Sequence, residues 1–141
     1  MEILILSGCL VINNKKEILM LFKKNHKHYE TPGGKVENCK DPLKPTIEEL
    51  KREAQRETYE ELGNDIKISE PKYFGNISFT ILDGRIAIAH KFTTTILEGT
   101  PKNNEPEVFD HIKWIPIKEL EQHPISPDFI DLMPKIKELL S

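Results

Sequence analysis

Apolar runs separated by short polar segments organise the first third of the chain. Residues 3–12 are apolar and rich in β-branched side chains, and the polar stretch 13–16 separates them from a second apolar run at 18–22. This pattern predicts two strands joined by a turn, which is a hairpin. A basic segment follows at 23–28, and Pro-Gly-Gly at 32–34 predicts a turn that ends regular structure.

The clearest periodicity predicts a helix between Thr46 and Gly63. Thr46 and Glu49 have the spacing of a capping box, and Gly63 stands where a helix-terminating glycine is expected. The segment 37–45 before this helix contains two prolines and no periodicity, so we expect an irregular loop there. Spacings of three and four residues place five side chains on one core-facing stripe, with the threonine contributing its methyl group: Ile47, Leu50, Ala54, Thr58 and Leu62.

The second half of the chain alternates extended segments with turns and ends in a helix. Segments 66–82 and 85–97 flank an Asp-Gly pair and predict a second hairpin. Residues 109–115 predict a last strand, and Ser-Pro-Asp at 126–128 supplies an N-cap, a first-turn proline and a first-turn acid for a helix over 126–140. The order strands, helix, strands, helix predicts an α+β sandwich in which helices flank a mixed sheet.

Length and charge limit the classes of function. The 141 residues fit one domain spanning positions 1–141. Twenty Lys and Arg residues against 23 Asp and Glu residues give a net charge of −3, which argues against duplex DNA as a partner. The longest apolar stretch is about half of the roughly 20 residues that a membrane-spanning helix needs, so we expect no membrane association. No export signal is recognisable, and Cys9 and Cys39 show no metal-binding spacing, so we expect a cytoplasmic protein with reduced thiols.

Acidic side chains crowd one face of the predicted helix. Glu57, Glu60 and Glu61 are three and four residues apart, so they project to the same side, where like charges weaken a helix by roughly a few tenths of a kcal/mol per pair. A divalent cation would offset this repulsion, and Mg²⁺ favours a few carboxylates together with water and substrate phosphate. Arg56 is positioned to orient the Glu60 carboxylate. An acidic face that is simply solvated is the alternative.

Glycines and lysines upstream of the helix complete a candidate phosphate site. Gly33 and Gly34 permit backbone conformations that other residues resist, so their peptide groups can face a ligand. Lys23 and Lys35 offer positive charge to phosphate oxygens.

These two segments together resemble the Nudix box, written G-x5-E-x7-R-E-U-x-E-E-x-G-U, where U is a bulky apolar residue. The matching residues are Pro-Gly-Gly-Lys-Val-Glu at 32–37 and Arg-Glu-Thr-Tyr-Glu-Glu-Leu-Gly at 56–63. The strands before the box, the hairpin after it and the last helix extend the resemblance to nearly the whole chain. Two departures stand out: Thr58 and Asn64 replace bulkier apolar residues, and about eight extra residues separate the two parts of the box. We expect the inserted loop, 38–45, to cover the site or shape its selectivity.

The resemblance implies a Nudix-type α/β/α sandwich and a metal-dependent hydrolase. It assigns Glu57, Glu60 and Glu61 as ligands of Mg²⁺, or of Mn²⁺, together with the Gly33 carbonyl. It makes Arg56 the structural clamp of these acids. Glu105 resembles an additional family acid that ligates a metal or helps to activate water, and the alternative for Glu105 is a solvated loop acid.

Four residues are candidates for substrate binding: Lys23, Gly34, Lys35 and Asp128. Asp128 resembles a region that contacts the base in some members of the family, but capping of the last helix also explains its position.

The implied reaction is hydrolysis of a nucleoside diphosphate linked to another group. Our leading prediction is a Mg²⁺-dependent enzyme that converts a ribo- or deoxyribonucleoside triphosphate to the monophosphate and pyrophosphate. The length leaves no room for the separate N-terminal domain that builds the dimeric site of ADP-ribose pyrophosphatases, and we expect a monomer or a homodimer. The alternatives are hydrolysis of ADP-ribose, of a dinucleoside polyphosphate or of an RNA cap, and a nucleotide sensor without catalysis.

Overall fold

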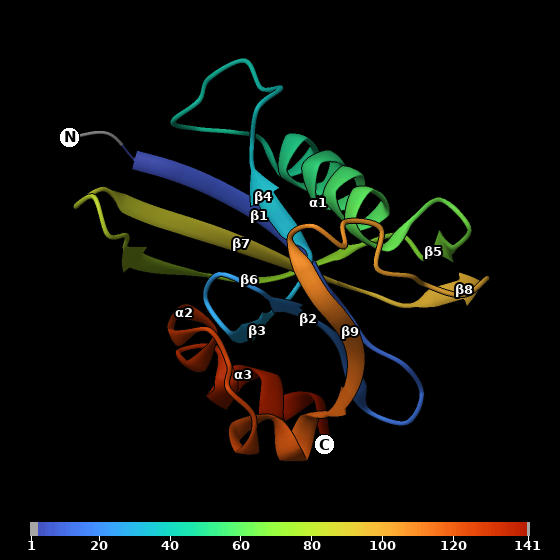
Figure 1. Ribbon diagram of the computed structural model, residues 1–141. Helices are drawn as coiled ribbons and strands as arrows, with labels where there is room; N and C mark the ends of the chain where they lie inside the picture. The colour runs from blue at the N-terminus through green and yellow to red at the C-terminus, as the bar shows by residue number, and fades with distance from the viewer. Residues whose placement is uncertain (1–2, 141) are drawn as a thin grey trace.

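Two sheets and one long helix form the framework of the computed structural model, which describes residues 3–140 (Figure 1). The first sheet has the order β4-β1-β7-β6; β1 pairs antiparallel with β4 and parallel with β7, and β7 pairs antiparallel with β6. This sheet is therefore mixed, as predicted. Its strands are β1 (Ile3–Val11), β4 (Gly33–Lys35), β6 (Lys72–Thr80) and β7 (Ile86–Thr94).

The second sheet, of order β3-β2-β9, is antiparallel, and a short antiparallel pair, β5-β8, lies apart from it. The helix α1 (Ile47–Leu62) packs against the first sheet, whereas short helical segments close the other end of the molecule (Figure 1). The remaining elements are β2 (Glu17–Lys23), β3 (His28–Glu30), β5 (Lys67–Ile68), β8 (Ile96–Glu98), β9 (Phe109–Pro116), the 3₁₀ segments η1 (Ile117–Gln122) and η2 (Glu138–Leu140), and the helices α2 (Pro127–Ile130) and α3 (Met133–Lys137).

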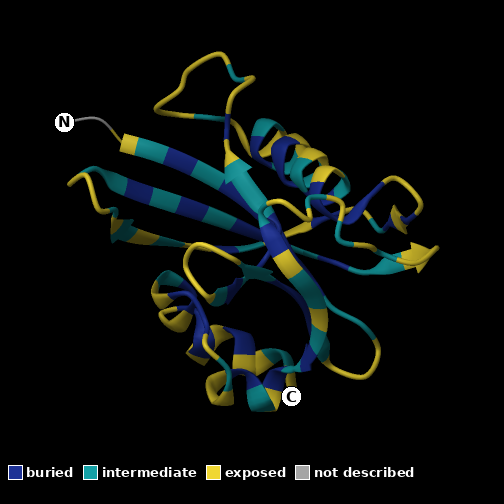
Figure 2. Ribbon diagram, in the orientation of Figure 1, coloured by how far each residue is buried: buried dark blue, intermediate teal, exposed yellow. Residues whose placement is uncertain are grey.

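Strand β1 lies between two hydrophobic cores, and most of its residues are buried (Figure 2). Its side chains alternate between the two faces of the sheet and so contribute to both cores. The Ser7 hydroxyl donates to the Leu50 carbonyl at 2.7 Å, and the Cys9 thiol donates to the Ala54 carbonyl at 3.7 Å, so the odd-numbered residues face α1. Leu10, on the opposite face, belongs to the core that contains the C-terminal helices.

The predicted helix is confirmed together with its ends. The Thr46 hydroxyl and the Glu49 carboxylate exchange hydrogen bonds with each other's backbone N–H, which is the predicted capping box. Gly63 ends the helix with a φ of 91° and donates its N–H to the Tyr59 carbonyl. Ile47 is a correction to the predicted stripe: it is 49% exposed, because the first turn of the helix extends beyond the sheet that buries the later turns.

The predicted first hairpin is wrong in its pairing. A turn does connect β1 to β2, but these strands lie in different sheets and touch only through an isolated bridge between Ile12 and Ile18. The reason is that β4 and β7 already occupy both edges of β1. The predicted break at 32–34 is also wrong in part, because Gly33 and Gly34 belong to strand β4.

Several predicted long elements are divided in the structure. The Asp-Gly hairpin is confirmed, with Gly84 at a φ of 90°, but its arms are split into β5 and β6 and into β7 and β8. The predicted helix over 126–140 is also wrong as one element, since Pro134 lacks the N–H that continuation would require. The Ser126 side chain makes no capping hydrogen bond. The predicted last strand is confirmed as β9.

Candidate active site

Arg56 gathers the acids of α1 into one network. Its guanidinium binds Glu53 in a bidentate manner, with Nε and Nη2 at 2.7 and 2.8 Å from the two carboxylate oxygens. The same group donates to Glu57 at 2.8 Å and to Glu60 at 2.6 Å. Glu53 is only 5% exposed, so the bidentate bond supplies the opposite charge that a buried carboxylate requires.

The paired glycines of β4 lie directly against the same face of the helix. The Gly33 N–H donates to a carboxylate oxygen of Glu61 at 2.8 Å. A Cβ atom at Gly34 would stand 2.4 Å from a carboxylate oxygen of Glu57, so any larger residue here would displace the Glu57 carboxylate from its present position. Glu60 differs from both because its side chain is 48% exposed and turns toward Arg56.

The pKa values of the acids reflect these surroundings. Burial raises the pKa of Glu61 to about 9, and the negative charges of Glu57, Glu105 and Glu30 add to this, whereas the hydrogen bond from Gly33 acts in the opposite direction. Burial also raises the pKa of Glu57. In contrast, hydrogen bonds from Arg56 lower the pKa of Glu53.

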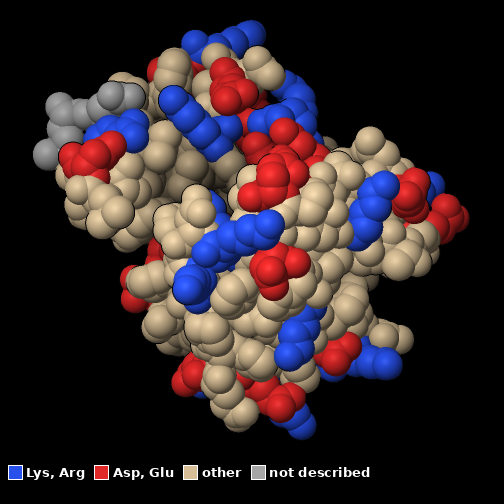
Figure 3. All heavy atoms as spheres, viewed as in Figure 1, with Lys and Arg blue, Asp and Glu red and all other residues tan. Residues whose placement is uncertain are grey.

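The loop after β8 brings Glu105 to this acidic face. Asn104 anchors the loop, because its N–H donates to the Glu61 carbonyl at 3.0 Å and its side-chain amide donates to the Glu60 carbonyl at 2.9 Å. The pKa of Glu105 is raised by burial and by the charges of Glu60 and Glu107. Figure 3 shows acidic atoms gathered over α1 with basic atoms beside them.

The donor set of this face fits a divalent cation that prefers oxygen. Val36 N–H and the Pro32 carbonyl bond to β1, so the peptide groups of Gly33 point to the outer edge, as the bond from its N–H to Glu61 shows. Its carbonyl therefore faces outward beside Glu61. The carboxylates of Glu57 and Glu61 beside this outward carbonyl are oxygen donors of the kind that Mg²⁺ or Mn²⁺ takes.

Within residues 3–140, three potential ligand atoms come within 4.8 Å of one another only at His26, His28 and Glu30. The oxygens of the α1 acids are spread further because Arg56 and the Gly33 N–H hold them. The histidine group lies in the basic segment, and Lys23 stands 3.9 Å from Glu30, so its surroundings favour anions over cations.

The predicted substrate-binding residues take different positions. Lys35 is exposed on β4, and Lys23 is half-buried beside Glu30. Asp128 lies in the first turn of α2, where it is half-buried. Burial lowers the pKa of Lys91 of β7, and the negative charge of Asp128 opposes this.

Two buried charged residues were given no role from the sequence. Glu53 is the buried partner of Arg56, and its spacing of three residues from Arg56 was a usable signal. Lys91 is only 9% exposed, and the signal was a lysine within an otherwise apolar strand.

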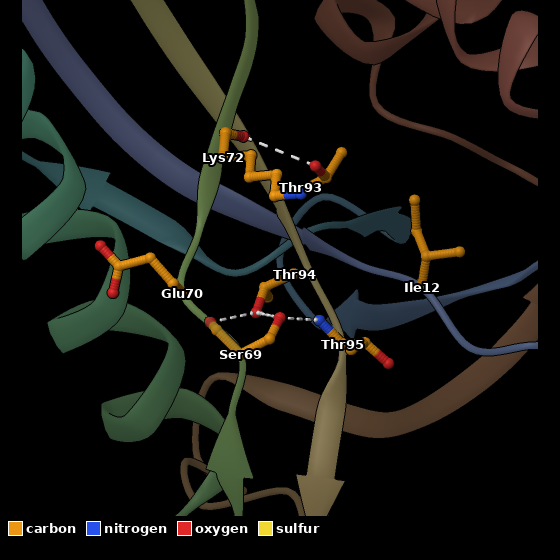
Figure 4. Close-up of a pocket in the computed structure, with 7 residues that line it drawn as sticks. All are labelled: Ile12, Ser69, Glu70, Lys72, Thr93, Thr94 and Thr95. Carbon is orange, nitrogen blue, oxygen red and sulfur yellow. Dashed lines mark hydrogen bonds between the residues drawn. The ribbon is translucent and has the colours of Figure 1, made fainter.

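A separate hollow of about 410 Å³ lies where β6 and β7 leave the first sheet (Figure 4). Its hydroxyl groups bind one another or the backbone: Thr94 donates to the Ser69 carbonyl at 2.7 Å, and Ser69 Oγ accepts from the Thr95 N–H at 3.0 Å. None of the acids of α1 lines it, so this hollow is not part of the candidate site.

The comparisons with known proteins agree with this geometry. A family model described as the NUDIX domain matches residues 6–136, and the chain therefore belongs to the Nudix family. Family and fold define a pyrophosphohydrolase that acts on nucleoside diphosphates linked to another group, and the predicted α/β/α sandwich is confirmed. No match was found among curated protein sequences.

Solved structures similar to this chain share its fold over nearly their full lengths. A MutT NUDIX hydrolase from Burkholderia pseudomallei has 19% identity and a TM-score of 0.78, over 96% of this chain and 98% of that one. A MutT protein from Methanosarcina mazei Go1 has 21% identity and a TM-score of 0.76, over 99% and 96%. An Ap4A hydrolase from C. elegans has 16% identity and a TM-score of 0.70, over 97% of both chains.

Proposed function

We propose that this protein hydrolyses nucleoside triphosphates to nucleoside monophosphates and pyrophosphate in a Mg²⁺-dependent reaction. The observation that carries the proposal is the cradle in which Glu61 binds the Gly33 N–H, Glu57 lies over Gly34 and Arg56 holds the acids together. The choice of triphosphates rests on the resemblance to MutT-type members of the family, and two similar MutT structures align with this chain over nearly its whole length.

Glu57, Glu60 and Glu61, with the Gly33 carbonyl, would hold the metal ions in this proposal. Bound Mg²⁺ neutralises charge on phosphate oxygens and lowers the pKa of water. Arg56 keeps the acids positioned through its bond to the buried Glu53. Glu105 would accept a proton from the attacking water, and this part of the proposal is supported by the loop anchored through Asn104, which brings it to the acidic face. Lys23 and Lys35 would bind the outer phosphates.

A substrate panel with product identification tests the proposal. Nucleoside triphosphates, ADP-ribose, a dinucleoside polyphosphate and capped RNA are each incubated with Mg²⁺ and, in parallel, with a chelator. We expect the triphosphates to give pyrophosphate and monophosphate only when Mg²⁺ is present. Preferred turnover of another substrate would replace the proposed one, and absence of turnover on the whole panel would favour a nucleotide sensor.

Substitutions in the acidic cradle distinguish hydrolysis by this protein from hydrolysis by a contaminating enzyme. Glu60→Gln is expected to lower kcat by about 100-fold or more while the protein stays folded, because a neutral amide is a poor metal ligand. Glu70→Gln is the matched control, since Glu70 is exposed and pairs only with Lys51 in the described structure. Equal activity of the two variants would contradict the proposed role of the acidic cradle.

A further inference from the structure

Lys91 of β7 is a buried lysine outside the acidic cradle. It is 9% exposed, and its ammonium donates one hydrogen bond, to the Thr31 hydroxyl at 3.0 Å. Within residues 3–140 this ammonium forms no ion pair. Burial of a charged group is costly, and an apolar side chain of similar size would avoid that cost. The bond to Thr31 is therefore the contact that an apolar residue at this position would lose.

Thr31 lies where the chain passes from one sheet to the other. Strand β3 of the second sheet ends at Glu30 and strand β4 of the first sheet begins at Gly33, so only Thr31 and Pro32 lie between them. Thr31 is buried, and its hydroxyl accepts from an inner strand of the first sheet. The bond from Lys91 therefore fixes the crossing point of the chain to the body of that sheet.

The chain between Thr31 and Gly33 is stiff. The ring of Pro32 fixes its own φ and restricts the backbone of the residue before it. The Pro32 carbonyl accepts from the Cys9 N–H at 3.0 Å, and a Cβ atom at Gly8 would stand 2.1 Å from the same carbonyl. The segment thus lies directly against β1, and a displacement at Thr31 is passed on to Gly33.

A row of residues across the first sheet connects Lys91 to the cradle. Lys91 pairs with Gly8 on β1, and Gly8 pairs in turn with Gly33 on β4. Gly8 carries no side chain between its two partners, and the hydrogen bond shows that the lysine side chain extends across β1 to Thr31. Lys91 therefore contacts the segment that leads into Gly33.

Gly33 is the residue at which this segment meets the acidic cradle. Its N–H donates to a carboxylate oxygen of Glu61 at 2.8 Å. Both the direction of this N–H and the place of the Gly33 carbonyl depend on how the preceding residues are held. The ammonium of Lys91 is the side-chain donor that holds them.

We propose that Lys91 is a positioning residue of the acidic cradle, which fixes Thr31 and so holds the Gly33 peptide group against Glu61. The inference rests on the proposed function, since it takes the cradle to be the site of a divalent cation. In this proposal Lys91 acts through Thr31 and Gly33 and contacts neither the metal nor the nucleotide. Its loss should therefore weaken metal binding and leave nucleotide affinity nearly unchanged.

The two partners of the hydrogen bond can be removed one at a time. Lys91→Met keeps the approximate length of the side chain and removes the ammonium, whereas Thr31→Val keeps the shape and removes the hydroxyl. Thr31→Ser retains the hydroxyl and should behave as the wild type. Lys72→Met is the matched control, because it makes the same substitution at an exposed position of the same sheet. Thr31→Val answers the question if Lys91→Met does not fold.

Calorimetric titration of the nucleotide-free protein with Mn²⁺ measures the effect on the metal site. The Kd should rise about tenfold in Lys91→Met and in Thr31→Val, as is typical when a group that orients metal ligands is lost. Thr31→Ser and Lys72→Met should keep the wild-type Kd. The double variant of Lys91→Met and Thr31→Val should bind no more weakly than either single variant, because both remove the same contact. An unchanged Kd in both single variants, or losses that add, would overturn the inference.

Amide hydrogen exchange followed by NMR tests the position of Gly33 without metal. The Gly33 N–H should exchange about tenfold or more faster in Lys91→Met and Thr31→Val, because its bond to Glu61 is loosened. The N–H of Ala54, in the buried middle of α1, should keep its wild-type rate. Equal acceleration of both amides would show a general loss of stability instead, and would overturn the inference.

Steady-state kinetics distinguish positioning from contact with the substrate. In Lys91→Met the Mg²⁺ concentration that gives half the maximal rate should rise about tenfold, while KM for the nucleotide at saturating Mg²⁺ stays within about twofold. A raised KM with an unchanged requirement for Mg²⁺ would mean that Lys91 binds the nucleotide, and would overturn the proposed role.

The titration and the exchange measurement separate this inference from the proposed function, because neither requires turnover. Hydrolysis of nucleoside triphosphates by the wild type, with unchanged Mn²⁺ affinity and Gly33 exchange in both site variants, would leave the proposed function standing and refute the role of Lys91. The expected changes in affinity and exchange, without hydrolysis of any nucleotide, would refute the proposed activity and support the role of Lys91.

Discussion

Glu53 and Glu61 lie at the two ends of the acidic face of α1, and the fold shifts their pKa values in opposite directions. Glu53 and Glu61 are both 5% exposed, yet the pKa of Glu53 is lowered and that of Glu61 is raised to about 9. The difference is that Arg56 binds Glu53 directly, whereas Glu61 receives only the Gly33 N–H and faces other acids. Burial alone does not determine the charge of a carboxyl group, because the decisive factor is whether the fold supplies a cation. One end of the helix is therefore complete, because Arg56 pairs with Glu53, and the other is incomplete, because Glu61 makes no ion pair within residues 3–140.

The largest effect is expected from removing the charge at the incomplete end. Glu61→Gln should lower kcat/KM by about 1,000-fold or more because the carboxylate ligand is lost, yet the amide oxygen can still accept from Gly33. Steady-state kinetics with Mg²⁺ measure the loss, and circular dichroism checks the fold. Activity within tenfold of the wild type would show that Glu61 is not part of the catalytic machinery.

Removing the cation at the complete end of the helix should lower the stability of the folded protein. Arg56→Met leaves Glu53 buried without its partner and should lower the free energy of unfolding by about 2 kcal/mol, less than for a fully buried pair because the Arg56 side chain is 40% exposed. Urea denaturation measures this change. Adding Glu53→Gln to that variant should restore part of the loss, and a double variant that is less stable than Arg56→Met would contradict the ion-pair explanation.

The contributions of Glu53 and Glu61 to stability should also depend on pH in opposite directions. In the metal-free protein, Glu61 contributes stability that is fully present below pH 4.5 and is lost as the pH rises toward about 9, because the folded state holds the proton more tightly than the unfolded chain. Glu53 has the reverse sign, since its contribution is lost as the pH falls through its lowered pKa.

Thermal denaturation with a chelator at pH 5 to 9 tests whether the contribution of Glu61 to stability falls as the pH rises. The Tm of the wild type minus that of Glu61→Gln should fall across this interval, by about 3 °C or more for a chain of this size. Mg²⁺ should remove the fall, because it stabilises the ionised carboxylate. A difference in Tm that rises with pH in the chelator would refute the assignment.

The smallest effect is expected from the loop acid beside the incomplete end. Glu105→Gln should lower kcat by about tenfold and leave KM nearly unchanged, as expected for a residue that assists proton transfer. Glu107→Gln is the matched control from the same loop, since it is exposed. Equal kcat values for the two variants would support the solvated-acid alternative for Glu105.

The local parts of this structure could be predicted from the sequence. The capping box of Thr46, the end of α1 at Gly63 and the clustering of Glu57 and Glu61 follow from spacings within one helix. Such features need no knowledge of distant contacts, and the motif shared with the Nudix family is local in the same sense.

The non-local parts could not be predicted in this way. Strand β1 pairs with β4 and β7 instead of its neighbour β2, and this choice depends on which edges distant segments occupy. The position of Lys91 beside Thr31 joins residues 60 positions apart through two sheets, so no spacing along the chain reveals it. The alternation of β7 does place Lys91 and Phe92 on opposite faces of the sheet, but only the structure shows that the face of Lys91 is the one turned away from α1.

The contact between Glu61 and Gly33 also covers one amide group at an edge of the first sheet. Strand β4 forms the rim of the first sheet, and a rim with unsatisfied amide groups invites pairing by a neighbouring chain. The same acid that would ligate the metal engages one of those amides, so a substitution that shortens it, such as Glu61→Ala, would open the rim. Glu61 therefore covers part of this edge in addition to its proposed role as a metal ligand.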